Sequence, residues 1–372
     1  MSGRCIVLGV FAGLLAIAQP APEQILRQAI TEHQSGDLAA AIRDYRAYLK
    51  LRPDAVDARS NLGAALSRSG RYAEAIVEYR EALKRSPKNP PIWLNMALAY
   101  YKSGQISRAA DELAGIHALQ PENKQVTLLL ADCWLRQGSD ARVIEILTPL
   151  EQKDTGDLAV AYMMGTALLR AKEMDRGQRI IDRILRQGDS AEARLLLGTA
   201  KLNALEYTAA IADLQRASEL NPKLPDVYSY LGRAHMDSGH MASARTAFEK
   251  ELEQNPNDFE SNLNLAVLLK QSEEYDRALK LLDRALLVRP GDLGALYQVG
   301  AIQLAANQLE KARVTLEGIL KQAPKFTEAH ISLAAVYYRL KRKVDGDRER
   351  AIVQKLKAEE DAARSGKTPA KP

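Results

Sequence analysis

Prolines recur along this chain at a fixed interval of 34 residues. One series is Pro53, Pro87 and Pro121, and a second is Pro222, Pro256, Pro290 and Pro324. The two series lie 101 residues apart, one short of three intervals, so three units separate them and one unit has lost a residue. A constant period of this size indicates an array of repeated supersecondary units.

Counting from Pro22 gives ten units. They start at residues 22, 56, 90, 124, 158, 191, 225, 259, 293 and 327. The eighth residue of every unit is Gly or Ala, the twentieth is small in most of the first nine, and the twenty-fourth is a large apolar or aromatic residue. Each unit has two apolar stretches at helical spacing with a polar turn between them. We therefore expect two antiparallel helices per unit that cross closely at the small residues, with the proline ending the second helix.

Two stretches carry the pattern most fully. They are IWLNMALAYYKSGQISRAADELAGIHALQP (92–121) and VYSYLGRAHMDSGHMASARTAFEKELEQNP (227–256). Both resemble the tetratricopeptide repeat. The resemblance covers residues 22–340 and implies an all-α fold, a right-handed α-solenoid of about ten helix-turn-helix repeats. The small positions specify packing and not chemistry, so the implied function is generic: binding of other proteins or peptides.

The N-terminus has the layout of a secretory signal peptide. A positive start, MSGR, precedes an apolar run from Cys5 to Ala18, and the small residues AIA stand just before Gln19. We expect residues 1–18 to be removed and the protein to be exported, either periplasmic or secreted, in a bacterial type of cell. An uncleaved anchor is the alternative. Cleavage would leave Cys133 as the single cysteine, so the exported chain would have no internal disulfide.

The charge distribution and the lengths of the apolar stretches limit which kinds of partner the chain can bind. The net charge is +5 with acids and bases mixed along the chain, which argues against a dedicated nucleic-acid binder. No later apolar stretch is long enough for a transmembrane helix. The sequence leaves the oligomeric state open.

Two places depart from the repeat. In unit four, Thr155 stands where proline is expected and Pro149 falls inside the expected second helix, and in unit five Gly177 replaces the second small Ala. One interpretation is a hinge at residues 140–157, and the other is repeat decay that still stacks. In unit ten the pattern breaks at KRKVDGD (341–347), so we expect Asp347 to cap a final helix within 341–363 that closes the array. Residues 364–372 are expected to be disordered.

Groove residues follow from the resemblance, because family members bind ligands with recurring positions of the first helices. These positions are occupied here by Leu94, Leu98, Tyr101, Leu128, Tyr162, Leu169, Leu195, Leu202, Tyr297, Leu304 and Tyr338. An apolar groove with interspersed tyrosines suits an extended or helical segment of another protein. Packing against the next repeat is the alternative role for any one of them.

Two polar series accompany the groove. The first is a basic rail of Arg68, Lys102, Arg136 and Arg170, spaced by 34, and the second is the asparagines Asn61, Asn95 and Asn264. The rail would bind an acidic partner, or would complement the helix dipole in the last turn of each first helix. The asparagines would hold peptide backbone, as in a related superhelix of the family.

Motifs for catalysis or cofactor binding are not found in the sequence. The five histidines have no zinc-ligand spacing, and there is no phosphate-binding glycine loop. We therefore expect no enzyme, no metal and no cofactor, and a scaffold or adaptor that binds proteins in its concave groove. The alternatives are a binder of cell-envelope polysaccharide and a non-catalytic subunit of an envelope enzyme complex.

Overall fold

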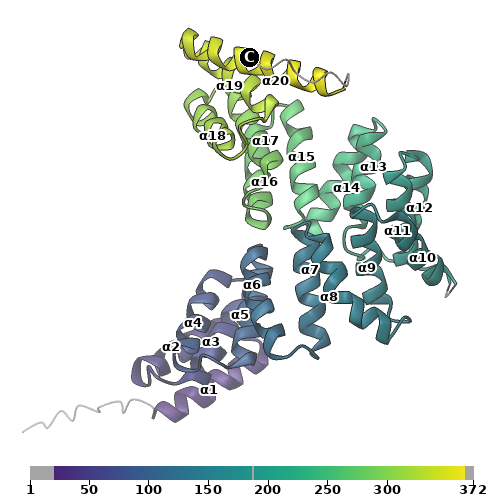
Figure 1. Ribbon diagram of the computed structural model, residues 1–372. Helices are drawn as coiled ribbons and strands as arrows, with labels where there is room; N and C mark the ends of the chain where they lie inside the picture. The colour runs from purple at the N-terminus through teal and green to yellow at the C-terminus, as the bar shows by residue number, and fades with distance from the viewer. Residues whose placement is uncertain (1–20, 187, 365–372) are drawn as a thin grey trace, which may run out of the picture. The chain divides into compact units, whose positions relative to one another are not determined.

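The computed structural model describes residues 21–186 and 188–364, which form twenty helices and no strand (Figure 1). The first helices of successive pairs are α1 (Pro22–Ser35), α3 (Val56–Arg68), α5 (Pro90–Lys102), α7 (Lys124–Arg136), α9 (Leu158–Arg170), α11 (Ala191–Asn203), α13 (Val227–Asp237), α15 (Phe259–Gln271), α17 (Leu293–Ala305) and α19 (Thr327–Arg339). The second helices are α2 (Leu38–Leu51), α4 (Tyr72–Arg85), α6 (Ile106–Leu119), α8 (Asp140–Lys153), α10 (Met174–Leu185), α12 (Tyr207–Leu220), α14 (Met241–Gln254), α16 (Tyr275–Val288), α18 (Leu309–Gln322) and α20 (Lys343–Arg364). The predicted all-α solenoid of ten helical hairpins is confirmed.

The 34-residue period fixes where helices begin. Nine of the ten first helices start at the first residue of their predicted unit, and every second helix starts at position seventeen. The exception is α13, which starts two residues late because Pro225 and Asp226 form a turn before it. Asp226 has a φ of 66°, a left-handed conformation that few non-glycine residues adopt.

Parts of the chain that carried predictions lie outside the described residues. They are the expected signal peptide (1–18) and residues 365–372 of the expected tail. Among the described helices, none combines the length and the apolar character needed to cross a lipid bilayer.

The chain forms two compact units, unit 1 (Met1–Ala99) and unit 2 (Tyr100–Pro372). In unit 1 the core is built on two tyrosines at position twenty-four, Tyr45 and Tyr79, each 1% exposed. The Tyr79 ring lies over Gly63, where an added Cβ atom would be 2.7 Å from the nearest ring carbon.

The same small-against-large crossing recurs in unit 2. A Cβ atom added to Gly198 would lie 2.6 Å from Leu214, and one added to Gly232 would lie 2.6 Å from the Phe248 ring. Both pairs join position eight to position twenty-four of one repeat. The sequence expectation for the hairpin crossing is therefore confirmed in atomic detail.

Short polar side chains cap several first helices. Each accepts a hydrogen bond from a backbone N–H in the first turn of the helix that follows it, and they are Asn123, Asp157, Ser190, Asp258 and Asp292. Such caps stabilise a helix by about 0.5–2 kcal/mol. All five are the last residue of a repeat, so they also set where the next hairpin starts.

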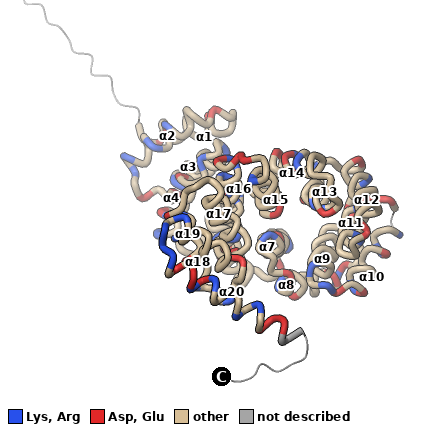
Figure 2. Tube along the Cα trace, turned by 90° about the horizontal axis from the view of Figure 1, so that it is seen from above, with Lys and Arg blue, Asp and Glu red and all other residues tan. Residues whose placement is uncertain are grey.

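Within unit 2 the stack turns back on itself. Helix α16 contacts α6, and the Arg289 Nε donates to the Arg136 carbonyl oxygen at 2.7 Å. The Asn257 side-chain amide donates to the Lys102 carbonyl oxygen at 3.4 Å. Figure 2 shows first helices α7, α9, α11 and α13 on the inside of this arrangement and their second helices outside. The segment from Tyr101 to Arg289 is called the closed turn below.

Packing continues through residues 140–157, where one interpretation placed a hinge. A single core cluster joins Ala131 and Leu135 before this segment to Val160 and Leu196 after it. Helix α8 runs through Pro149, and the Thr148 hydroxyl donates to the Ile144 carbonyl oxygen at 2.5 Å. The boundary between the two compact units lies elsewhere, after Ala99. The structure therefore supports a repeat that has decayed and still stacks.

The tenth repeat is complete, which corrects the prediction for the C-terminal part. Helix α20 begins at Lys343, in phase with the array, and not at a cap formed by Asp347. Gly346 takes the small position twenty, because an added Cβ atom would lie 2.7 Å from the Tyr338 ring. Asp347 lies inside the helix and accepts a hydrogen bond from the Tyr338 hydroxyl at 2.7 Å. The capping helix predicted for 341–363 is thus the extended second helix of repeat ten.

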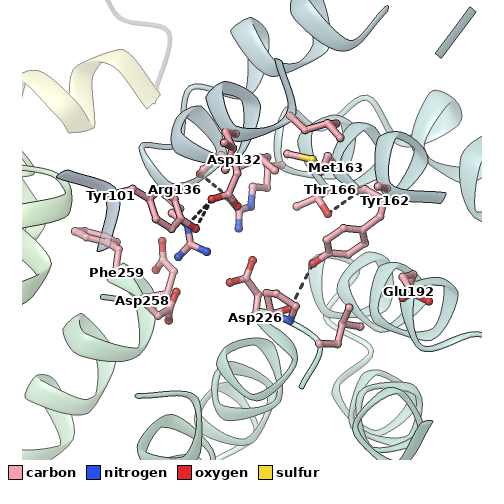
Figure 3. Close-up of a pocket in the computed structure, with 18 of the residues that line it drawn as sticks. Tyr101, Asp132, Arg136, Tyr162, Met163, Thr166, Glu192, Asp226, Asp258 and Phe259 are labelled. Atoms are coloured by element: carbon pink, nitrogen blue, oxygen red, sulfur yellow. Dashed lines mark hydrogen bonds and ion pairs between the residues drawn. The ribbon is translucent and has the colours of Figure 1, made fainter. Parts of the chain in front are cut away.

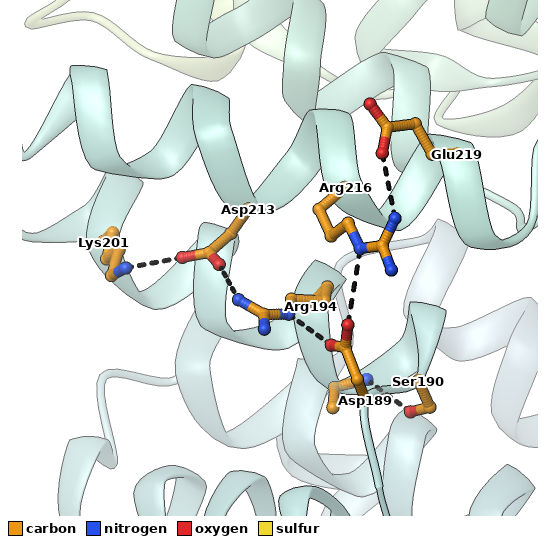
Figure 4. Close-up of polar contacts among 8 residues, drawn as sticks. Asp189, Ser190, Arg194, Lys201, Asp213, Arg216 and Glu219 are labelled. Atoms are coloured by element: carbon orange, nitrogen blue, oxygen red, sulfur yellow. Dashed lines mark hydrogen bonds and ion pairs between the residues drawn. The ribbon is translucent and has the colours of Figure 1, made fainter.

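A polar network holds the junction after the shortened fifth repeat (Figure 4). Asp189 contacts Arg194 at 2.5 Å and Arg216 at 3.3 Å. The buried carboxylate of Asp213 binds both Arg194, at 2.7 Å, and Lys201, at 2.5 Å. Because the network joins the junction to both helices of repeat six, the missing residue does not interrupt the stack.

The hairpin crossing predicts a contrast between two glycines. Gly232→Ala is expected to destabilise the protein by about 1–3 kcal/mol, because the methyl group overlaps the Phe248 ring. Gly318→Ala, in α18 with nothing within 4 Å of the added Cβ, is expected to be neutral or to stabilise by up to about 1 kcal/mol. Urea denaturation of both variants measures the difference. Equal effects of the two changes would contradict the crossing as described.

Candidate functional site

The inside of the closed turn contains a cavity of about 700 Å³. Helices α7 and α9 form one side of it, and the end of α5 contributes Tyr101. The opposite side comes from the turn Leu224–Asp226 and from the segment Asp258–Glu260 at the start of α15. The cavity therefore depends on repeats three to eight being wound into one turn.

Apolar side chains line the wall made by α7 and α9. They are Leu128, Leu129, Leu158, Tyr162 and Met163. Leu158 is 41% exposed, and the Tyr162 hydroxyl reaches the Pro225 carbonyl oxygen at 3.4 Å across the cavity. An apolar wall with a few oriented polar groups is typical of a ligand-binding cavity.

A second wall carries a tyrosine, an aspartate and an arginine in contact (Figure 3). The Tyr101 hydroxyl donates to Asp132 at 2.6 Å, and the Arg136 Nε donates to the same carboxylate oxygen at 2.9 Å. Burial and the neighbouring Asp132 raise the pKa of Tyr101 well above its ordinary value. The phenol therefore stays neutral and acts as a hydrogen-bond donor at physiological pH.

Three carboxyl groups meet at the N-termini of α13 and α15. The Glu251 carboxyl accepts from the Asp226 backbone N–H at 3.2 Å, and Asp258 accepts from the Ser229 hydroxyl at 2.9 Å. Burial, Asp258 and Asp226 together raise the pKa of Glu251 to about 8. Burial and Asp258 raise the pKa of Asp226 to about 6, although Arg136 and Arg170 act in the opposite direction. The negative charges of these carboxylates are therefore not fully balanced by nearby positive groups.

A smaller polar cavity of about 240 Å³ adjoins the first. The two share five lining residues, namely Arg170, Asp226, Asp258, Glu260 and Arg289. Beyond these, the smaller cavity is lined by polar groups such as Asp140, Thr199 and Asn203. The inside of the closed turn is therefore apolar at one end and polar at the other, with the carboxylates between.

The basic rail has a structural contact that recurs along the chain. In unit 1, Arg68 donates to the His33 carbonyl oxygen at 2.9 Å. In unit 2, Arg170 donates to the Leu135 carbonyl oxygen at 2.8 Å, and Arg339 donates to that of Leu304 at 2.9 Å. Each arginine thus adds a hydrogen bond to a carbonyl near the C-terminal end of the first helix one repeat earlier, where a cation also complements the helix dipole. Of the other rail members, Arg136 lines the cavity and Lys102 is exposed.

The predicted groove residues separate into distinct places. Tyr101, Leu128 and Tyr162 meet at the cavity. In unit 1, Leu94 and Leu98 are half-buried. Near the C-terminus, Tyr297 and Leu304 pack against the last core cluster, and Tyr338 lines a hollow beside α20.

Three groove predictions are corrected. Leu169 and Leu202 are each 2% exposed and Leu195 is 1% exposed, so none of them lines a groove. Leu169 fills the space left by Gly177, and Leu195 and Leu202 pack in a core cluster with Val227 of α13. Packing between helices, the alternative noted from the sequence, accounts for their apolar character.

The asparagine series is not brought together at the cavity. Asn61 and Asn95 are half-buried in unit 1, and Asn264 is half-buried in unit 2. None of the three is among the residues that line the cavity.

Asp226, Glu251 and Asp258 were missed by the sequence analysis. One sequence signal was present, since Pro225 adds a second proline just after Pro222 and so marks an irregular turn. The cap position of Asp258 was also recognisable. That they face Arg136 and Tyr162 follows only from the closed turn, which joins residues far apart in the sequence.

Other chemistry-bearing groups give no sign of reactivity. Cys133 is fully buried, and burial raises the pKa of its thiol well above the ordinary value. In the part of the chain that the structure describes, no three His, Cys, Asp or Glu side chains are placed to hold a metal ion. A second hollow of about 870 Å³ lies between Trp134, Arg142 and Pro149.

Comparison with known proteins agrees with the hairpin geometry. Three family models for tetratricopeptide repeats match the chain. The first matches residues 26–90, 94–145 and 230–295, the second matches residues 66–116 and 269–336, and the third matches residues 206–239. These matches together cover more than half of the chain. The protein therefore belongs to the tetratricopeptide repeat family.

Individual relatives match only in part. Superkiller protein 3 of Schizosaccharomyces pombe is 27% identical over 191 residues, which are 45% of this chain and 14% of that protein. Tetratricopeptide repeat protein 21B of Homo sapiens is 34% identical over 111 residues, 30% of this chain and 8% of that protein. The chain thus spans a small fraction of the length of these relatives.

Solved structures show the same fold at low identity. A tetratricopeptide repeat protein from Parabacteroides merdae is 16% identical with a TM-score of 0.58, over 67% of this chain and 98% of that one. The APC/C hetero-tetramer Cut9–Hcn1 contains a chain that is 15% identical with a TM-score of 0.56, over 90% of this chain and 80% of that one. At these identities the likeness concerns the fold alone.

The carboxyl cluster predicts a pH-dependent stability. The pKa of Glu251 is about 8 in the folded protein against an ordinary 4.5, so the folded state holds a proton that the unfolded state has lost. The free energy of unfolding should therefore fall as pH rises towards 8, by up to about 1.4 kcal/mol per pH unit. Glu251→Gln, which stays neutral and keeps an acceptor oxygen, should flatten the fall between pH 6.5 and 8, where Asp226 has largely lost its proton.

Denaturant titrations at several pH values measure this dependence. Glu253→Gln is the matched control, because Glu253 lies exposed in the same helix α14. A wild-type stability that is constant from pH 6.5 to 8 would refute the assignment.

Proposed function

We propose that this protein is a non-catalytic scaffold that binds an extended segment of a partner protein inside the closed turn. The supporting observation is the cavity that combines the apolar wall of α7 and α9 with the polar groups of Tyr101, Asp132 and Arg136. Repeats of this family generally form non-catalytic scaffolds for protein interaction, which agrees with the proposal.

The shape of the space favours an extended occupant. The apolar and polar cavities adjoin and share residues, so a chain segment can contact both in sequence. Tyr162 offers a large contact area at low entropic cost, and the adjacent leucines offer apolar pockets for side chains. A folded domain would contact only the outside of the turn.

The proposal also includes export. Residues 1–18 have the charged start, apolar run and small-residue site of a signal peptide. An exported scaffold of this kind would meet its partners in the periplasm or outside the cell. The single remaining cysteine, Cys133, is buried, so the mature chain exposes no thiol in the described residues.

Binding of a peptide in the cavity is tested by substituting tryptophan for two exposed alanines, one in the cavity and one outside it. Ala159 is the exposed second residue of α9 and lines the cavity, whereas Ala141 is the exposed second residue of α8 and does not. We expect the chain from Gln19 to enrich peptides from a random 12-residue display library. Ala159→Trp, which fills the cavity, should abolish binding of those peptides, and Ala141→Trp should leave it unchanged.

Binding of the enriched peptides is measured by fluorescence anisotropy, with circular dichroism as the check that both variants fold. Recovery of no peptide, or equal binding by the two tryptophan variants, would refute the proposed groove.

Export predicts a defined mature N-terminus. When the full chain is expressed in a bacterium with an outer membrane, it should be released with the periplasmic fraction and start at Gln19. Intact-mass measurement of the purified protein determines the start. A chain that keeps Met1 in the cytoplasmic fraction would contradict export.

A further inference from the structure

We propose that the partner segment carries a basic side chain, arginine or lysine, whose cation lies between the carboxylates of Asp226 and Asp258. This inference rests on the proposed function and assigns a chemical class to its occupant. Figure 3 shows both carboxylates directed into the cavity from the side opposite the α7 and α9 wall.

The charges around the cavity do not balance. Its lining residues include five carboxylates and three guanidinium groups: Asp132, Glu192, Asp226, Asp258 and Glu260 against Arg136, Arg170 and Arg289. Asp132 is paired with Arg136 at 2.9 Å, and Glu260 with Arg289 at 3.1 Å. The remaining three carboxylates face one remaining arginine, which leaves the cavity with an excess of negative charge.

Arg170 offsets this excess only in part, because it forms no ion pair with the three carboxylates. Its guanidinium donates to the Leu135 carbonyl oxygen at 2.8 Å and to the Tyr230 hydroxyl at 3.0 Å. Within the described residues, no ion pair joins Asp226, Asp258 or Glu192 to a cation. A cation brought in by a ligand would therefore find carboxylates with which no cation of the described residues is already paired.

The raised pKa values of Asp226 and Glu251 also indicate an excess of negative charge at this end of the cavity. The pKa of Asp226 is raised to about 6 even though Arg136 and Arg170 favour its charged form. Glu251 lies behind Asp226 with a pKa raised to about 8. Because burial and mutual repulsion cause both shifts, an added positive charge would stabilise the ionised cluster.

The surroundings suit a long basic side chain better than a bare cation. The methylene stem of lysine or arginine can lie along the apolar wall while its charged end reaches the carboxylates. Tyr162 lies on that path, since its hydroxyl is 3.4 Å from the Pro225 carbonyl oxygen, one residue before Asp226. Apolar residues next to the basic one in the partner segment would contact Leu128, Leu129 and Met163.

Conservative substitutions can remove the negative charge of each carboxylate while keeping the fold intact. Asp226→Asn keeps a residue that tolerates the left-handed backbone at this position, and Asp258→Asn keeps a good helix cap. Asp292→Asn is the control, because Asp292 caps α17 in the same way one repeat later and does not line either cavity. Thermal melts followed by circular dichroism verify that all variants are folded.

The experiment selects from the random 12-residue library with the chain from Gln19, and with each variant. The wild type and Asp292→Asn should enrich peptides with arginine or lysine next to apolar residues. The variant with both Asp226→Asn and Asp258→Asn should lose that enrichment and bind the wild-type peptides about tenfold or more weakly. Wild-type peptides without enriched basic residues would overturn this inference and leave the proposed function standing.

A second measurement changes the charge of the peptide and leaves the wild-type protein intact. An enriched peptide is resynthesised with citrulline in place of arginine, or norleucine in place of lysine. The neutral peptide should bind the wild type about tenfold or more weakly, and the Asp226→Asn variant should discriminate less between the two. Equal affinity of charged and neutral peptides would overturn the inference, whereas recovery of no peptide at all overturns the proposed function and this inference together.

Discussion

The close crossing of two helices within each hairpin is the contact on which the rest of this structure depends. At four of the five crossings where a glycine occupies position eight, it leaves room for one large side chain from position twenty-four, as Gly232 does for Phe248. Because interiors are close-packed, this interlock sets how the two helices lie and so how each hairpin meets the next. Repeats of one geometry then stack into a curved array, and the curvature produces an inside and an outside.

Closure of the array turns that inside into a cavity. Two hydrogen bonds hold the closed turn together. The Arg289 side chain donates to the Arg136 carbonyl oxygen, and the Asn257 side chain donates to the Lys102 carbonyl oxygen. Both use carbonyl oxygens at the C-termini of first helices, which are free to accept because they have no partner within their own helix. Carbonyls near the ends of other first helices accept from Arg68, Arg170 and Arg339, so one kind of backbone acceptor serves both stacking and closure.

Much of the fold follows from the sequence, and only part of the site does. Periodicity predicted the helix starts almost to the residue, because local patterns decide them. It also placed Tyr101, Leu128 and Tyr162 on inner faces. Leu169, Leu195 and Leu202 were wrongly predicted to line a groove, because their burial depends on the neighbouring repeat and cannot be read from one repeat position. Asp226 and Asp258 were missed because the residues opposite them depend on the rotation between successive repeats, and this rotation accumulates over several repeats.

Closure of the turn also orders the events of assembly. Apart from the closure, contacts run mainly between neighbouring helices, so most of the array can form piecewise as the chain emerges. The cavity exists only after Arg289 has returned to the fourth repeat, 153 residues behind it. A chain interrupted before that point would hold well-formed hairpins and no enclosed space. Completion of the eighth repeat is therefore the step that gives a stack of helices an enclosed cavity.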